Sequence, residues 1–180
     1  LIYEQDILVR AATRGDGVQG DDITTNIRQI RSVPLSARFS AYGIQQIEIR
    51  GEVLLTKKHF KAFNEKLADQ NLPPLANPRN AASGSLRLKD PTEVRRRNLE
   101  AFLYHVSYHI DEGVIPEALL THSGSLQMLW DLGFRSPNQE KKVFSGIDAV
   151  VAYCQEFEAG RDALPYEIDG MVIKVNRLDL

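Results

Sequence analysis

The sequence predicts an α+β domain, with mainly antiparallel sheets flanked by helices, on three observations. Several segments alternate apolar and polar residues, as strands do, and follow one another along the chain like the strands of hairpins. Segments whose apolar residues have helical spacing lie between them. The 180 residues, 43% hydrophobic and 26% charged, are enough for one substantial core. There is no internal repeat, and no apolar run approaches the ~18–20 residues that a membrane-spanning helix needs.

The first part of the chain is expected to contain a hairpin and a short helix. Strands Leu1–Tyr3 and Ile7–Thr13 flank a turn at residues 4–6. A loop with three glycines and three aspartates follows. A helix should then run from about Asp22, a residue that favours the N-cap position, to Ile30.

The central part predicts two strands and a helix. Ile47–Leu55 alternates, with charged residues facing away from the apolar ones. Thr56 is expected to cap the helix that follows it. Ala101–Ile110 is rich in aromatic and β-branched residues and should be a strand, so we do not expect His105 and His109 to be a helical metal-binding pair.

The last part predicts two helices and a final strand. Ser123–Leu132 and Ile147–Glu158 have helical spacing, and the most linker-like stretch of the chain, Gly133–Gly146, joins them. Tyr166–Val175 should be a strand. Cys154 lies among apolar residues of the second helix, so we expect it to pack in the core; as the only cysteine, it excludes an internal disulfide framework.

Charge is unevenly distributed. The net charge of −2 argues against general coating of nucleic acid. Residues 77–98, however, contain six basic and two acidic side chains, so this segment is +4 and the rest of the chain is −6. A basic patch on an acidic body suits local phosphate binding, although a solvated helix end would have the same composition.

A Gly-x-Gly-x-x-Gly pattern occurs at Gly15, Gly17 and Gly20. The three aspartates in and beside it would repel a pyrophosphate, and no acidic residue follows at the distance that ribose recognition needs. We therefore interpret the loop as a tight turn. It places Arg14 at the end of a strand, either as an anion ligand or as an ordinary surface arginine.

Glu52 is the candidate ligand of the central strand. It follows Gly51, which could allow a ligand to approach the backbone, and its carboxylate could bind a ribose hydroxyl or a metal. The alternative is a solvated strand carboxylate. Tyr104 and Tyr108, on the later strand, could stack on a base or fill the core.

The most distinctive stretch is Asn77–Arg87. Asn77 followed by Pro78 predicts the start of a helix. Arg79 and Arg87 are eight residues apart, so a continuous helix would carry both on one side, about 12 Å apart. Guanidinium groups bind phosphate through paired donors, which makes the two arginines candidates for phosphate contacts.

The apolar segment near the C-terminus carries Asp169 and Lys174. On a regular strand their odd separation would put them on opposite faces, unless Gly170 marks a bulge. A lysine at the end of an apolar strand is costly to bury alone, so we expect it to meet an anion. Asp169 could be a metal ligand or a turn residue.

Four stretches, in this order and spacing, resemble the adenylation domain of bacterial NAD-dependent DNA ligases: Ala11–Gly17, Ile49–Val53, Asn77–Arg87 and Ile168–Asn176. The resemblance covers nearly the whole chain. It implies a nucleotidyltransferase-type (ATP-grasp-like) fold. It also implies an enzyme that transfers AMP from NAD to a lysine and then to the 5′-phosphate of a nick in double-stranded DNA, before the 3′-hydroxyl displaces it.

The resemblance also implies roles for individual residues. Arg14 and Glu52 would hold the nucleotide, with Glu52 near the ribose or a magnesium ion. Tyr104 would stack on adenine, and Lys174 would neutralise the phosphate under attack. Asp169 would organise metal or water.

The remaining cations would contact phosphate. Arg79 and Arg87 would engage DNA or nucleotide phosphate once a nick is bound, and Arg161 is a weaker candidate for the nucleotide. NAD, as AMP donor, and magnesium are the cofactors implied, and zinc would belong to domains outside this chain.

Residues 1–180 are expected to be an incomplete adenylation domain. The family's Lys-x-Asp-Gly motif, which contains the nucleophile, should precede Leu1, and its last phosphate-binding lysine motif should follow Leu180. The chain alone should therefore not become adenylated. We expect a cytoplasmic bacterial monomer; the alternatives are a non-catalytic nucleotide- or DNA-binding module and an ATP-dependent nucleotidyltransferase.

Overall fold

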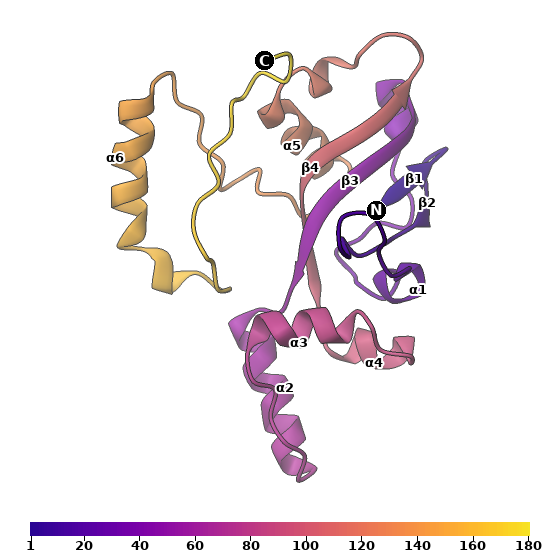
Figure 1. Ribbon diagram of the computed structural model, residues 1–180, viewed down its shortest axis with the longest axis vertical. Helices are drawn as coiled ribbons and strands as arrows, with labels where there is room; N and C mark the ends of the chain where they lie inside the picture. Colours follow the sequence, from indigo (N-terminus) through magenta and orange to yellow (C-terminus); the bar gives the residue numbers. More distant parts are fainter.

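A four-stranded antiparallel sheet, in the order β2-β1-β3-β4, organises the computed structural model, which describes residues 1–180 (Figure 1). The strands are β1 (Ile2–Glu4), β2 (Ile7–Arg10), β3 (Ile44–Leu54) and β4 (Glu100–Asp111). This confirms the mixed helix and antiparallel-sheet class. The predicted hairpin is also confirmed, with a tight turn in which both Gln5 and Asp6 have positive φ, as a type I′ hairpin turn requires.

The long β3–β4 pair is interrupted by bulges. Arg50 pairs with His105 and Gly51 with Leu103, so Tyr104 has no partner on β3. A bulge leaves one residue outside the ladder and changes the direction of its side chain. The pattern of alternation therefore shifts at Tyr104, and its ring is exposed.

The core lies on one side of the sheet and is built around an aromatic cluster. The ring of Tyr3 meets Phe39 and Phe134 edge-on, at centroid distances of 5.3 and 5.4 Å. The Tyr3 hydroxyl donates to the carbonyl of Pro34, and burial raises the pKa of this phenol. All 30 buried residues of the molecule lie between Tyr3 and Ser136, so residues 137–180 contribute none.

Helices surround this sheet, and four of them begin at a residue whose side chain caps the first turn. Thr56, Asn77, Asp90 and Thr121 each accept a hydrogen bond from a backbone N–H of the first turn. The α-helices are α1 (Thr24–Ile27), α2 (Lys57–Asp69), α3 (Pro78–Ser85), α4 (Pro91–Arg96), α5 (His122–Asp131) and α6 (Ile147–Glu158). Short 3-10 turns are η1 (Phe39–Tyr42), η2 (Glu117–Leu119) and η3 (Arg161–Ala163).

Two predictions about the C-terminal part are wrong. Helix α6 forms over the predicted residues but has no buried residue, and Cys154 is only half-buried. The aromatic rings of the helix pack locally, with Tyr153 against Phe157 of the same helix and Phe144 of the connector before it. Helical spacing predicted the helix correctly, but it could not predict that the helix would stand apart from the sheet (Figure 1).

The predicted strand Tyr166–Val175 is the second error, since it pairs with no other strand. Its residues form no ladder and include bends at Tyr166 and Asp169, and the nearest bridge joins Arg177 to Thr121. β-branched residues favour extended backbone, but a strand also needs a neighbour for its N–H and C=O groups. The predicted helix from Asp22 to Ile30 is likewise shorter, covering only α1.

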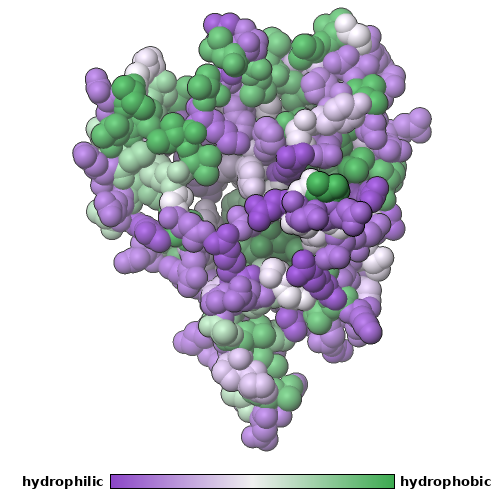
Figure 2. Space-filling view, viewed as in Figure 1, coloured by the Kyte–Doolittle hydropathy of each residue, from purple (hydrophilic) through white to green (hydrophobic).

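None of the helices is long and apolar enough to cross a membrane. In Figure 2, apolar side chains gather over the part of the surface where α6 lies in Figure 1, whereas much of the rest of this face is hydrophilic.

Candidate functional site

The β3–β4 pair and the C-terminal segment bring together most of the predicted site residues. Residues 166–176, called the strap below, connect two attachment points. At its start, the ring of Tyr166 meets Phe102 of β4 edge-on at 5.2 Å, and the carbonyl of Pro165 accepts from the N–H of Lys57. At its end, Asn176 is bonded to the first turn of α5. The strap therefore carries Asp169 and Lys174 between two fixed ends.

One cluster contains two carboxylates and a guanidinium. Arg79 of α3 forms an ion pair with Asp169 of the strap, and its Nη2 lies 3.9 Å from Oε1 of Glu52 on β3. All three side chains are more than half exposed, so solvent screens the charges strongly. The arrangement is best regarded as a polar site open to a ligand, rather than as a source of stability.

A second cluster lies on the bulge of β4. The Nζ of Lys174 is 5.7 Å from the centroid of the Tyr104 ring, within the range of a cation–π contact. The rings of His105 and His122 are close by, with centroids 6.2 Å apart. Burial lowers the pKa of both histidines, and the positive charge of Lys174 lowers it further. Both imidazoles are thus biased toward the neutral form.

Arg87 lies apart from these clusters. Helix α3 ends at Ser85, so the expected continuous helix through Arg79 and Arg87 does not form. The Nε of Arg87 bonds to Oδ2 of Asp21, at the end of the glycine-rich loop, 3.0 Å away. The two arginines therefore pair with carboxylates in different parts of the chain, and both remain mostly exposed.

The glycine-rich loop is a closed turn. Its Asp16 carboxylate accepts from the backbone N–H groups of Gln19 and Val18, which hold its pKa below the usual range. A Cβ on Gly15 would lie 1.6 Å from the carbonyl oxygen of Gln19. The first glycine is thus required by close backbone packing, consistent with a tight turn. Arg14, at its start, is exposed.

Comparison with known proteins identifies the family. The family model described as the NAD-dependent DNA ligase adenylation domain matches residues 1–180. This chain is a member of that family. It is 58% identical to a DNA ligase of Persephonella marina over its whole length and 53% identical to a DNA ligase of Aquifex aeolicus over 98% of it. A DNA ligase of Bacillus velezensis is 45% identical over 99% of the chain.

The chain spans about a quarter of the length of these relatives, between 24% and 26% of each. It therefore corresponds to the adenylation part of much longer ligases. The recognised family agrees with the resemblance that the four sequence stretches indicated.

Gly51 of this adenylation domain has a different role from the one expected. A Cβ there would lie 2.1 Å from the carbonyl oxygen of Phe102 and 2.8 Å from Cδ1 of Leu103. The space beside Gly51 is thus filled by the neighbouring strand, not left open for a ligand. The glycine permits the close approach of β4 at the bulge that exposes Tyr104.

Arg161 belongs to neither cluster, although its connection to the strap is direct. Its Nη2 donates to the carbonyl oxygen of Ile168 at 2.6 Å, one residue before Asp169. In this adenylation domain it therefore contacts backbone instead of presenting a free guanidinium. The prediction that it contacts phosphate remains a prediction.

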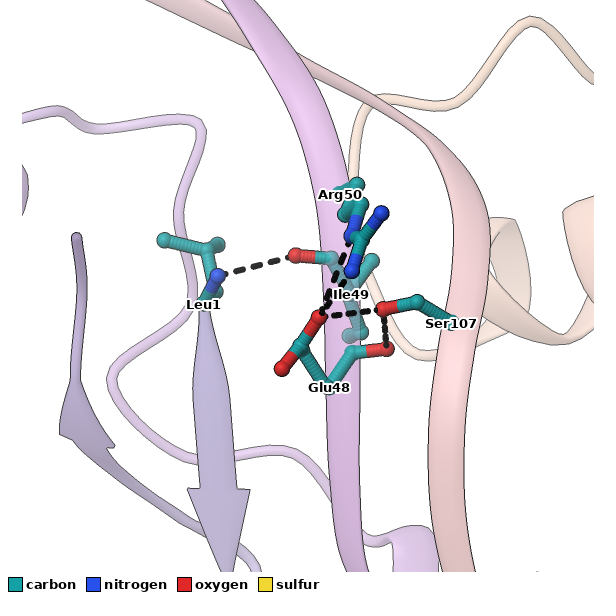
Figure 3. Close-up of polar contacts among 5 residues, drawn as sticks. All are labelled: Leu1, Glu48, Ile49, Arg50 and Ser107. Carbon is teal, nitrogen blue, oxygen red and sulfur yellow. Dashed lines mark hydrogen bonds and ion pairs between the residues drawn. The ribbon is translucent and has the colours of Figure 1, made fainter. Parts of the chain in front are cut away.

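Sequence analysis assigned no role to several polar residues near the site. Figure 3 shows that Glu48 accepts from both Arg50 and Ser107, and that the nitrogen of Leu1 donates to the carbonyl of Ile49. The Ser107 hydrogen bond is the main cause of the lowered pKa of Glu48. Ser107, like Tyr104, lies at a bulge, and no simple alternation pattern would have placed it beside Glu48.

Proposed function

We propose that this domain binds the AMP part of NAD and supports DNA nick sealing in a longer protein. The fold is proposed to be of the nucleotidyltransferase, ATP-grasp-like type. The observation that carries the proposal is the meeting of Lys174 with Tyr104, on the same strand pair where Arg79 meets Glu52 and Asp169. An aromatic face beside a cation is suited to a nucleotide, which has a flat base and a charged phosphate.

The chemistry requires a lysine that we propose lies outside residues 1–180. Its amine attacks the α-phosphorus of NAD, the phosphoanhydride bond breaks, and nicotinamide mononucleotide leaves. The 5′-phosphate of the nick then attacks the resulting phosphoramidate and breaks its P–N bond. Finally the 3′-hydroxyl attacks that 5′-phosphate, forming the phosphodiester and releasing AMP.

Each residue of the site contributes position or charge to these steps, which is most of what phosphoryl transfer needs. We propose that Tyr104 stacks on adenine and that Lys174 moves from its ring to the α-phosphate. Glu52 binds the ribose, while Arg14 contacts the nucleotide from the glycine-rich loop. Arg161 is kept as a weaker phosphate candidate, since it now bonds to backbone.

Magnesium is compatible with the donors present. Glu52 and Asp169 offer hard carboxylate oxygens, and Mg²⁺ commonly uses one or two carboxylates together with substrate phosphate. When bound, the ion would neutralise charge that develops on the phosphate. The guanidinium of Arg79 lies against the carboxylates of Glu52 and Asp169, so it would have to move away before both could bind the ion.

The test is adenylation of the full-length protein that contains this chain. With labelled NAD and magnesium, we expect a covalent AMP adduct, little adduct with ATP, and none on residues 1–180 alone. Lys174→Ala should slow adduct formation by about 10²–10³, the usual effect of losing one preorganised charge contact. Lys58→Ala, on the exposed side of α2, is the matched control and should be near wild type.

Each competing hypothesis gives a different result. Nucleotide binding with no adduct in the full-length protein would favour a non-catalytic module. Preference for ATP over NAD would favour an ATP-dependent nucleotidyltransferase. A near wild-type rate in Lys174→Ala would make this lysine a solvated surface residue.

A further inference from the structure

The end of the strap is attached through one residue, Asn176. It is the only residue among 171–180 that is not exposed. Its backbone carbonyl accepts from the N–H of His122 at 2.7 Å, and its side-chain Oδ1 accepts from the N–H of Ser123 at 2.8 Å. Asn176 therefore binds the start of α5 twice.

These bonds satisfy donors that a helix cannot satisfy itself. The first N–H groups of α5 have no partner within the helix. Thr121 accepts from Gly124, and Asn176 takes the two N–H groups before it. Two further contacts continue the attachment, a bridge between Thr121 and Arg177 and a bond from the N–H of Leu178 to the carbonyl of Leu120.

Lys174 precedes this attachment by two residues. Two residues span at most about 7 Å of chain, so an attachment at Asn176 limits how far Lys174 can move. The chain that binds α5 at Asn176 therefore also brings Lys174 to Tyr104, with Nζ 5.7 Å from the ring centroid. Met171, Val172, Ile173 and Val175 are exposed, so no apolar packing holds this part of the strap.

We infer that Asn176 is a positioning residue, whose side-chain hydrogen bond to the first turn of α5 keeps Lys174 beside the Tyr104 ring, within reach of a nucleotide bound there. Replacing its side chain removes the bond to Ser123, the side-chain attachment nearest to Lys174, while the backbone bond to His122 and the contacts of Arg177 and Leu178 remain. The expected effect of Asn176 on AMP transfer rests on the proposed function. Its effect on the position of the Lys174 side chain is independent of that function.

The first experiment observes Lys174 directly. The full-length protein is reductively methylated with ¹³C, and the Lys174 signal is identified by its loss in Lys174→Arg. In the wild type we expect an upfield ring-current shift that Tyr104→Leu abolishes. Asn176→Ala should lose most of that shift, whereas Asn176→Asp should keep it, because a carboxylate also accepts at a helix N-terminus and is favoured there.

The matched control is Asn64→Ala. The Oδ1 of Asn64 likewise accepts from a backbone N–H, that of Leu75, at 2.8 Å, but this contact is in the α2 region and away from the strap. It should leave the Lys174 signal unchanged. An unchanged Lys174 shift in Asn176→Ala would overturn the inference, as would equal loss in the Asn64 control.

The second experiment measures the rate of adduct formation with NAD. We expect Asn176→Ala to reduce it about 10- to 100-fold, as small displacements of a positioned group do. In a Lys174→Ala background the same change should cause almost no further loss, because residues that act through one another are not additive. A further full loss there would show a general structural role and overturn the inference.

If the wild-type full-length protein forms no adduct at all, the proposed function fails. The methyl-lysine shifts still decide whether Asn176 positions Lys174, so the two failures are distinguishable.

Discussion

Helices α5 and α6 have similar lengths and similar apolar spacing, yet only α5 packs against the body of the domain. α5 buries Leu126, Met128 and Leu129 against the body, whereas α6 buries nothing. The same contrast separates residues 1–136, which hold every buried side chain, from residues 137–180. Stability is therefore concentrated in the first region, while the second region carries three of the proposed site residues, Arg161, Asp169 and Lys174.

The strongest test of this contrast uses the same substitution in both regions. Ile49 on β3 is fully buried, and Ile173 on the strap is 61% exposed. Ile49→Ala should lower the free energy of unfolding by about 2–5 kcal/mol, because it removes buried methyl groups and leaves a cavity. Ile173→Ala should change it by no more than about 0.5 kcal/mol.

Denaturant titration of the two variants, followed by one probe of secondary structure and one of tertiary structure, measures the difference in their free energies of unfolding. Equal losses would mean that Ile173 is packed in solution. The division between the two regions would then be wrong.

A smaller effect is expected from the arginine that belongs wholly to the first region. Arg87 pairs with Asp21, whereas Arg79 reaches across to Asp169 of the strap. If Arg87 contacts DNA, Arg87→Ala should largely spare adduct formation but slow sealing by pre-adenylated protein. The log–log salt dependence of DNA binding should become shallower by about 0.9 for the lost phosphate contact.

The rates of single-turnover sealing and of adduct formation are measured for Arg87→Ala and the wild type at two salt concentrations. Arg177→Ala is the matched control, since Arg177 is also exposed and paired with an aspartate, Asp179, but lies outside the basic segment. Equal losses in both steps would assign Arg87 to the nucleotide site, and no loss in either would leave it a solvated side chain.

The smallest expected effect is on the pH dependence of stability, through two histidines that lie near Lys174 of the second region. His105 and His122 have pKa values lowered from 6.5, mainly by burial and then by Lys174. The unfolded chain therefore binds protons first as pH falls through about 6.5, and stability is lost on the acid side of that value. Above it both imidazoles are neutral in either state, and their contribution is fully present.

Thermal unfolding of the wild type and of a His105→Gln, His122→Gln variant at pH 8 and pH 5.5 measures this effect. The groups facing the pair are Lys174, on the strap, and Arg50, on β3, which repel added positive charge. The double variant should lose less stability on acidification than the wild type. Identical losses would mean that other groups cause the acid sensitivity.

Sequence patterns predicted the parts of the fold that depend on local chemistry. The caps at Thr56 and Asn77 and the extent of α6 followed from residue types that act within one turn. The helical periodicity of α6 and the β-branched residues of the strap did not reveal whether a partner was present, so the predictions of a core position for Cys154 and of a strand over Tyr166–Val175 were both wrong. Packing partners come from distant parts of the chain, which local spacing does not report.

The sequence supplied candidate residues for the site but not their arrangement. The odd spacing of Asp169 and Lys174 left open whether a bulge at Gly170 brings them to one face, whereas the bulge that the structure shows beside Lys174 lies on β4, at Tyr104. Asn176 was noticed only as part of a motif, because an asparagine that accepts from a helix N-terminus has no distinctive sequence pattern.

A segment fastened at both ends and exposed between them has a consequence for affinity. A ligand that contacts Asp169 and Lys174 must immobilise the backbone between them, and the entropy lost there is subtracted from its binding free energy. Affinity for such a ligand can therefore be tuned at residues that never touch it. Replacing an exposed strap residue by one that restricts the unbound chain would tighten binding, and added glycine would weaken it, with every ligand contact unchanged.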